Sequence, residues 1–132
     1  AVAVINLGRA FEQKGMYPQA LQAFQSILSF APNDPALLAF LGHIYAVSGQ
    51  KVAAEKIISR LQRMSRTRYV PSIYIALVYT GLGNKDEAFD WLNKAYDERC
   101  DHLVYLLTEP LADPLRGDLR FDALLLRLGL AK

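Results

Sequence analysis

Apolar side chains recur along this sequence at the spacing of amphipathic helices, in short segments separated by glycine and proline. The first segment, at about 2–14, places Val4, Leu7, Gly8 and Phe11 on one helical stripe. Five further segments of the same kind lie at about 18–30, 35–48, 51–64, 70–82 and 85–98. The pattern therefore predicts six helices before residue 100, in consecutive pairs joined by short turns.

The predicted helices repeat with a period of 34 residues. Large apolar, small, aromatic and turn-glycine positions all share this period in three copies. They are Leu7, Leu41 and Ile75; Gly8, Gly42 and Ala76; Phe11, Tyr45 and Tyr79; Gly15, Gly49 and Gly83; and Ala20, Ala54 and Ala88. A fixed period of this length is the signature of a helical repeat array.

These residues resemble the tetratricopeptide repeat, which is written W-x2-L-G-x2-Y, then A-x3-F, then P. The first copy follows the pattern through Phe24 and Pro32, whereas Arg66 and Cys100 replace the proline in the other two copies. The resemblance covers about residues 1–100. It implies an all-α, right-handed superhelix of three helix pairs, with repeats at about 1–34, 35–68 and 69–102.

The repeat is expected to fail after residue 100, because Pro110 stands where a fourth copy needs a small residue. A short helix is expected at 102–108, a loop at 109–117, and a last helix at about 118–128 with Asp118 as its cap. The last helix has an apolar stripe made of Phe121, Leu124, Leu125 and Leu128. We expect residues 101–132 to cap the last repeat, whose stacking face would otherwise be bare.

The tail is also similar to the C-terminal end of certain bacterial multidomain regulators. In those proteins a winged-helix, kinase or cyclase domain comes first and a tetratricopeptide array ends the chain. The resemblance is carried by the segments 68–71, 83–88 and 113–121. It implies that this chain is the C-terminal part of a larger bacterial regulatory protein.

Composition narrows the class of protein further. The 132 residues are 52% hydrophobic and 21% charged, which predicts one compact unit and excludes general disorder. No apolar run approaches the roughly 18 residues of a membrane span, and no signal peptide is visible. The helical pattern begins at once without a cap, so we expect a further segment before Ala1. A single cysteine fits a reducing, cytoplasmic location.

The predicted binding site is the face of each first helix that does not pack on its partner helix. This face is apolar and aromatic, except near the first repeat, and exposed apolar patches usually mark interaction sites. We predict a concave groove for a peptide or helix of a partner protein, with Phe40 and Tyr74 as its anchors. The groove residues are Asn6, Arg9, Phe40, His43, Val70, Ile73, Tyr74 and Leu77.

Some family members clamp a C-terminal carboxylate with basic and amide side chains in this groove. The matching places here are Ile5, Arg9, Phe40, Val70 and Tyr74, and only Arg9 is charged. The sequence therefore argues against a receptor of that type.

Two alternative interpretations remain open. The same apolar surface could mediate self-association into a homo-oligomer, or the chain's own cap could fill it. A basic run could instead contact an acidic partner or nucleic acid. It consists of Lys56, Arg60, Arg63, Arg66 and Arg68. Only Tyr69 lies close enough to this run for base stacking, which argues against nucleic acid as a principal ligand.

The sequence predicts no enzyme, no cofactor and no metal site. His43 and His102 fall in different elements, and Cys100 with His102 offers two metal ligands without a second pair. No base can be assigned to activate Cys100, which is expected to be a partly buried structural thiol. We therefore predict a non-catalytic module for protein–protein interaction.

Overall fold

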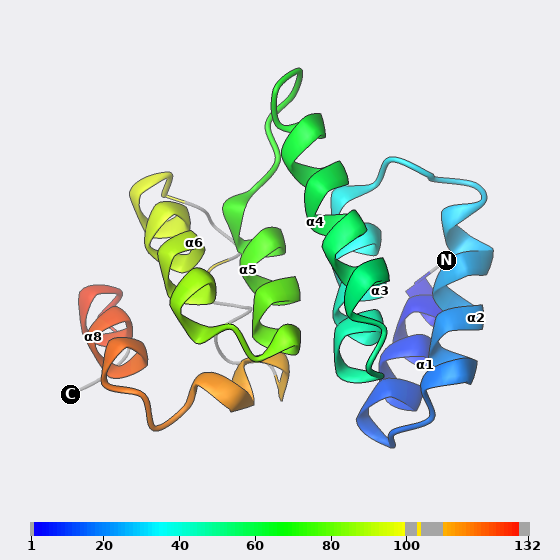
Figure 1. Cartoon of the computed structure of the whole chain (residues 1–132), viewed down its shortest axis with the longest axis horizontal. Helices are drawn as coiled ribbons and strands as arrows, with labels where there is room; N and C mark the ends of the chain where they lie inside the picture. The colour runs from blue at the N-terminus through cyan, green and yellow to red at the C-terminus, as the bar shows by residue number, and fades with distance from the viewer. Residues whose placement is uncertain (1, 100–102, 104–109, 130–132) are drawn as a thin grey trace.

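The structure, a computed structural model, describes residues 2–99, 103 and 110–129 (Figure 1). The described residues form seven α-helices and one 3-10 helix, with no strand among them. The first six helices make three consecutive pairs: α1 (Val2–Gln13) with α2 (Tyr17–Leu28), α3 (Pro35–Val47) with α4 (Lys51–Met64), and α5 (Ser72–Leu82) with α6 (Lys85–Asp97). The predicted all-α solenoid of helix pairs is confirmed.

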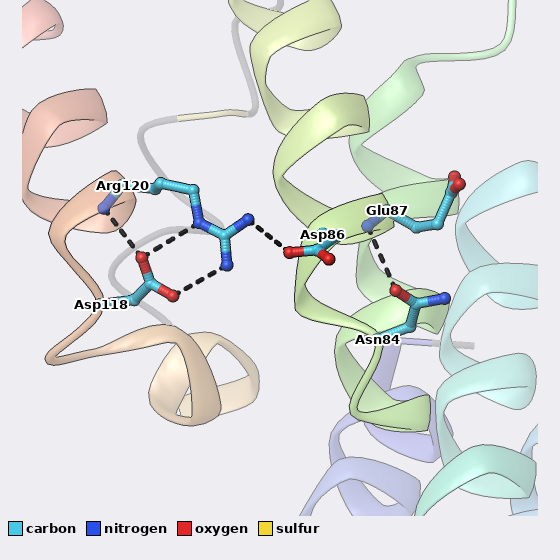
Figure 2. A network of polar contacts seen from close by, with 5 residues as sticks. All are labelled: Asn84, Asp86, Glu87, Asp118 and Arg120. Carbon is cyan, nitrogen blue, oxygen red and sulfur yellow. Dashed lines mark hydrogen bonds and ion pairs between the residues drawn. The ribbon is translucent and has the colours of Figure 1, made fainter.

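Two of the helix starts have side-chain caps, Asp34 at α3 and Asn84 at α6. The Asp34 carboxylate accepts hydrogen bonds from the Ala36 and Leu37 amides, at 2.9 and 3.3 Å, and so starts α3. At the start of α6, the Asn84 side chain accepts from the Glu87 amide at 3.3 Å. The Glu87 side chain points away from Asn84 (Figure 2), so one half of a capping box forms.

Small residues let the helices approach closely within and between pairs. A Cβ atom at Gly42 would lie 2.8 Å from Cγ2 of Ile57 in α4 and 2.9 Å from Cγ2 of Val78 in α5. A Cβ atom at Gly8 would lie 2.8 Å from Cε2 of Phe24. The repeated small position is therefore the point of closest contact in the first two repeats.

The hydrophobic core runs along the whole array. A first cluster joins the first three pairs through buried residues that include Phe24, Leu38, Leu61 and Val78. A second cluster joins the third pair to the residues that follow it. Because each pair buries apolar surface against its neighbour, the array is stable as a stack rather than as separate pairs.

The C-terminal segment, residues 110–129, packs on the third pair. It contains η1 (Pro110–Leu115) and α8 (Leu119–Arg127), which lie on α5 and α6 respectively. A 3-10 helix thus replaces most of the expected loop at 109–117. The expected helix at 102–108 lies outside the described residues except for Leu103, which is 1% exposed. Cys100 and His102 also lie outside them.

The 34-residue period continues into this segment, which the sequence analysis missed. Gly117 lies 34 residues after Gly83 and has a φ of +88°, in the left-handed region that favours glycine. The three earlier turn glycines, Gly15, Gly49 and Gly83, have φ values of +74°, +87° and +78°. Asp118 then accepts from the Arg120 amide at 2.9 Å and starts α8, as Asn84 starts α6. The fourth turn therefore repeats the geometry of the other three, and a 3-10 helix, η1, precedes it at Pro110–Leu115.

Arg120 attaches the start of α8 to α6. Its guanidinium donates to Asp86 at 2.7 Å and to Asp118 at 3.0 Å (Figure 2), and it lies 4.5 Å from the centroid of the Phe89 ring. The hydrogen bonds from Arg120 lower the pKa of Asp118, and those to Asp118 and Asp86 raise the pKa of Arg120. These groups are solvent-exposed, so they align the helices more than they stabilise them.

Arg127 repeats this arrangement two turns later. It donates to Asn93 at 3.2 Å and lies 4.0 Å from the centroid of the Tyr96 ring. Each arginine therefore contacts a polar residue 34 positions earlier and an aromatic ring 31 positions earlier. Because the offsets are those of the repeat, α8 lies beside α6 where the second helix of a fourth repeat would lie.

Candidate partner-binding surface

Four of the eight predicted groove residues reach the surface. Asn6 is exposed, and Arg9, Phe40 and Tyr74 are half-buried. Asn6, Phe40 and Tyr74 occupy the same position of successive repeats, on α1, α3 and α5. We call these four residues the first-helix surface.

The other four predicted groove residues are buried, and the expectation that they line an open groove is corrected. His43, Val70, Ile73 and Leu77 are 5%, 5%, 2% and 7% exposed. Ile73 belongs to the core cluster that includes residues of the C-terminal segment, and Leu77 packs with Ala39. Val70, Ile73 and Leu77 are apolar and His43 is polar, and neighbouring elements already cover all four.

Phe40 is held from two sides. Its ring stacks on Phe24 of α2, with centroids 5.7 Å apart and an angle of 19° between the planes. The Arg9 guanidinium of α1 lies 5.4 Å from the Phe40 centroid. One aromatic side chain thus connects three helices, and its remaining surface has a fixed orientation.

Tyr74 continues this surface on the next repeat. It packs against a small cluster formed by Ala39 and Leu77, and Phe40 packs against the same cluster. Two half-buried aromatic residues therefore flank one buried apolar cluster between α3 and α5. Partly exposed aromatic side chains on a rigid base are the usual anchors of protein interfaces.

A buried polar pair connects α1 to α3 one helical turn beyond Arg9 and Phe40. Nδ1 of His43 contacts Oε1 of Glu12, and the two residues are 5% and 6% exposed. The second carboxylate oxygen, Oε2, has no hydrogen-bond partner among the described residues. The sequence analysis missed this pair, although Glu12 and His43 are 31 positions apart, as Arg9 and Phe40 are.

The predicted basic run is only partly available to a ligand. Arg60 donates to the carbonyl oxygen of Pro32 at 2.6 Å and to the side chain of Asn33 at 3.0 Å, so it holds the loop between α2 and α3. The remaining basic residues of the run are exposed: Lys56, Arg63, Arg66 and Arg68. Lys56 and Arg63 line a shallow concavity of about 470 Å³ along α4.

The described part of the chain offers no group of three or more histidine, cysteine or acidic residues that could hold a metal ion. None of the helices in the described ranges has the length and apolar character needed to cross a membrane.

Comparisons with known proteins support the repeat architecture. Two matches to the family described as Tetratricopeptide repeat cover residues 11–70 and 75–99, together more than half of the chain. The chain is also similar to Protein O-mannosyl-transferase TMTC1 of Homo sapiens, with 28% identity over 89 residues. That match covers 67% of this chain and 10% of the relative, so the chain spans about a tenth of that protein's length. No solved structure gave a significant match. The chain belongs to the tetratricopeptide repeat family.

Proposed function

We propose that the chain is a non-catalytic interaction module that binds a peptide or helix of a partner protein on its first-helix surface. Helical repeat arrays bind ligands on the extended faces that their stacked helices create. Here that face carries two half-buried aromatic residues in register on successive repeats. This placement of Phe40 and Tyr74 is the observation that carries the proposal.

The chemistry of the first-helix surface indicates which kind of partner segment it would bind. Phe40 and Tyr74 offer apolar contact, so the segment needs apolar side chains that reach both rings. Asn6 and Arg9 lie at the α1 end and supply amide and guanidinium donors. An amphipathic segment with an acceptor group, such as a carboxylate, beyond its apolar anchors fits this order of residues.

The wider context of the module is also part of the proposal. The name of the human relative describes a transferase, but this chain spans a tenth of that protein, and we assign no catalytic role to the repeats. The similarity of segments 68–71, 83–88 and 113–121 to bacterial regulators supports a place at the C-terminal end of such a protein, in the cytoplasm.

A selection from a randomised peptide library against the immobilised chain tests the binding site. Selected peptides are expected to contain spaced apolar residues. Tyr74→Asp should weaken their binding by about 30-fold or more, the loss typical of an interface anchor. Tyr69→Asp is the matched control, because Tyr69 is 63% exposed and lies outside the first-helix surface. Equal affinity for the two variants, with helicity intact in both, would place the site elsewhere.

A second candidate is contact between the α4 concavity and an acidic partner. The observation in its favour is that Lys56 and Arg63 line this concavity together with Val52, which is 66% exposed. Binding there should weaken steeply as salt rises and disappear with Lys56→Glu, whereas binding at the first-helix surface should change little.

A further inference from the structure

Two aromatic side chains and three arginines lie exposed at one edge of the array. The loops between helix pairs, at 29–34 and 65–71, both lie at this edge, and the turns within pairs lie at the opposite one (Figure 1). Phe30 is 90% exposed and Tyr69 is 63% exposed. We call this surface the loop edge; it consists of Phe30, Arg63, Arg66, Arg68 and Tyr69.

Phe30 faces solvent from a loop that is itself fixed. Its amide donates to the carbonyl oxygen of Ile27 at 2.9 Å, and Arg60 of α4 donates to the carbonyl oxygen of Pro32 at 2.6 Å. Met64, the equivalent of Phe30 in the next repeat, is half-buried against the core. The repeat fold therefore does not require an exposed apolar side chain here, and the ring would gain free energy by leaving water.

The loop between α4 and α5 presents Tyr69 in a comparable way. The next residue, Val70, is 5% exposed and belongs to the core cluster of the array. At the other end of the loop, the Arg68 amide donates to the carbonyl oxygen of Met64 at 3.1 Å, so the last turn of α4 continues into the loop. The aromatic ring and the arginines thus extend from a segment whose two ends are held.

The charge of the loop edge has one sign. The stretch 56–85 contains six basic residues and no acidic one, although the net charge of the whole chain is only +2. On the neighbouring loop, the Asp34 carboxylate accepts hydrogen bonds from the first amides of α3. Asp97 and Glu98 lie at the end of α6, so the positive region is confined to the first two loops. A negatively charged partner complements this surface.

We propose that the loop edge binds the surface of an anionic phospholipid membrane. Phe30 and Tyr69 would enter the interface between headgroups and acyl chains, where aromatic residues are enriched in membrane proteins. The arginines would donate to headgroup phosphates, for which the guanidinium group is well suited. Each basic residue close to an anionic leaflet strengthens binding by roughly fivefold.

The shape of the loop edge favours a membrane over a single-stranded nucleic acid. Proteins bind such strands in basic grooves whose aromatic rings stack on the bases. The concavity on α4 is lined by neither Phe30 nor Tyr69, and both rings lie on loops at one edge, which a flat surface can contact together (Figure 1). No charged residue stands between Lys14 and Asp34, so Phe30 can enter an apolar layer without carrying a charge into it.

The loop edge is separate from the first-helix surface. It contains none of Asn6, Arg9, Phe40 and Tyr74, so membrane binding and partner binding can each fail without the other. It shares Arg63 with the α4 concavity, but Phe30 does not line that concavity. Dependence on Phe30 therefore distinguishes a membrane from an acidic partner bound at α4.

Sedimentation of the whole chain with lipid vesicles is the test. The chain should bind vesicles of phosphatidylcholine with about one third phosphatidylserine, bind those of phosphatidylcholine alone much less, and dissociate as salt rises to roughly 0.5 M. Phe30→Ser should weaken binding about tenfold, because it removes the inserted ring. Arg66→Gln combined with Arg68→Gln should weaken it about 20-fold, because two phosphate contacts are lost.

Two matched controls separate position from composition. Leu119→Ser removes an apolar side chain that is 82% exposed on α8, away from the loop edge, and should bind as the wild type does. Lys14→Gln combined with Lys51→Gln removes two exposed charges at the turns within pairs. This variant has the same net charge as the double arginine variant and should lose much less affinity.

Three outcomes would overturn the proposal. The first is no binding to the anionic vesicles, and the second is binding that Phe30→Ser leaves unchanged. The third is displacement from the vesicles by a single-stranded oligonucleotide whose own binding depends on Phe30, because the loop edge would then be a nucleic-acid surface. Since Phe30 is 90% exposed, its replacement should leave the fold intact, and circular dichroism of each variant verifies this.

Discussion

The two junctions between neighbouring helix pairs are built differently, although equivalent positions of the repeat form both. The first junction joins the pair α1 and α2 to the pair α3 and α4, and the second joins the pair α3 and α4 to the pair α5 and α6. At the second junction α5 lies along α3, and Gly81 comes close to it: a Cβ atom there would lie 3.0 Å from Cβ of Ala46 and 3.0 Å from Cδ2 of His43. At the first junction α3 contacts the preceding pair mainly through α2. The first junction is therefore the wider of the two on the side of the first helices.

Side-chain size at equivalent positions explains the difference. Glu12 stands in α1 where Ala46 stands in α3, and Val47 stands in α3 where Gly81 stands in α5. The larger residues keep α1 away from α3, and Phe40 fills part of the space. The period of the repeat sets which helices are neighbours, while the residues at a few positions set how closely they pack.

The chemistry of the two junctions differs as well. The pair Glu12 and His43 of the first junction corresponds to Ala46 and Leu77 in the second. A buried polar pair gains little net stability, because desolvation opposes its attraction, but losing one partner is costly. The first junction should therefore tolerate single changes poorly and tolerate replacement of the whole pair well.

The largest effect is expected from His43→Leu. This substitution gives the first junction a leucine, as the second junction has at the equivalent position, Leu77. The Glu12 carboxylate would remain buried without its partner, and the free energy of unfolding should fall by about 3–5 kcal/mol. Urea denaturation at neutral pH measures the loss. A decrease below about 1 kcal/mol would show that Glu12 reaches water, and the contrast between the junctions would then lose its main cause.

Replacing both partners should reverse most of this loss. The variant Glu12→Met with His43→Leu makes the first junction apolar at similar volume, so its stability should equal that of the wild type or exceed it by about 1–4 kcal/mol. The same urea series, completed with Glu12→Met alone, forms a double-mutant cycle. A double variant as unstable as His43→Leu would show that the lost contacts, and not the unpaired carboxylate, carry the cost.

The sequence predicts the part of the fold that depends on periodic positions. The three helix pairs, the Asp34 and Asn84 caps and the close approach at Gly8 and Gly42 all follow from local pattern. Burial at His43 and Ile73 could not be predicted in the same way, because it depends on which residues of other elements cover each position.

Some features outside the pattern did leave a signal in the sequence. Gly117, Arg120 and Arg127 each stand 34 residues after a residue that they repeat or contact. They follow Pro110, which stands where a fourth copy needs a small residue and so hides the repeat in the sequence. A degenerate repeat can thus keep the period in its turn and second helix even where proline interrupts the pattern before them.

Gly42→Ala tests the tighter packing of the second junction. The new Cβ would meet Ile57 and Val78, two β-branched side chains from different helices, and neither can rotate away easily. Overpacking costs about 1–3 kcal/mol, offset by about 1 kcal/mol of improved helix propensity, so the expected loss is about 0–2 kcal/mol. Thermal and urea denaturation measure it.

Gly8→Ala is the matched control for that substitution. The three atoms nearest to its Cβ all belong to the ring of Phe24, a flat side chain of the same helix pair. Its loss of stability should therefore be smaller than that of Gly42→Ala. Equal losses would mean that the contact with Val78 across the second junction contributes little to the cost.

The smallest effect is expected from Arg9→Gln at the first junction. The guanidinium lies 5.4 Å from the Phe40 centroid, and a cation in this position contributes about 0.5–1 kcal/mol when partly exposed. Lys14→Gln is the control, because it removes a cation from the end of the same helix without changing a ring contact. If Arg9→Gln lowers the unfolding free energy more than Lys14→Gln does, the cation–aromatic contact helps to hold α1 against α3 across the wider junction. If the two losses are equal, the contact between Arg9 and the Phe40 ring contributes little to the stability of the first junction.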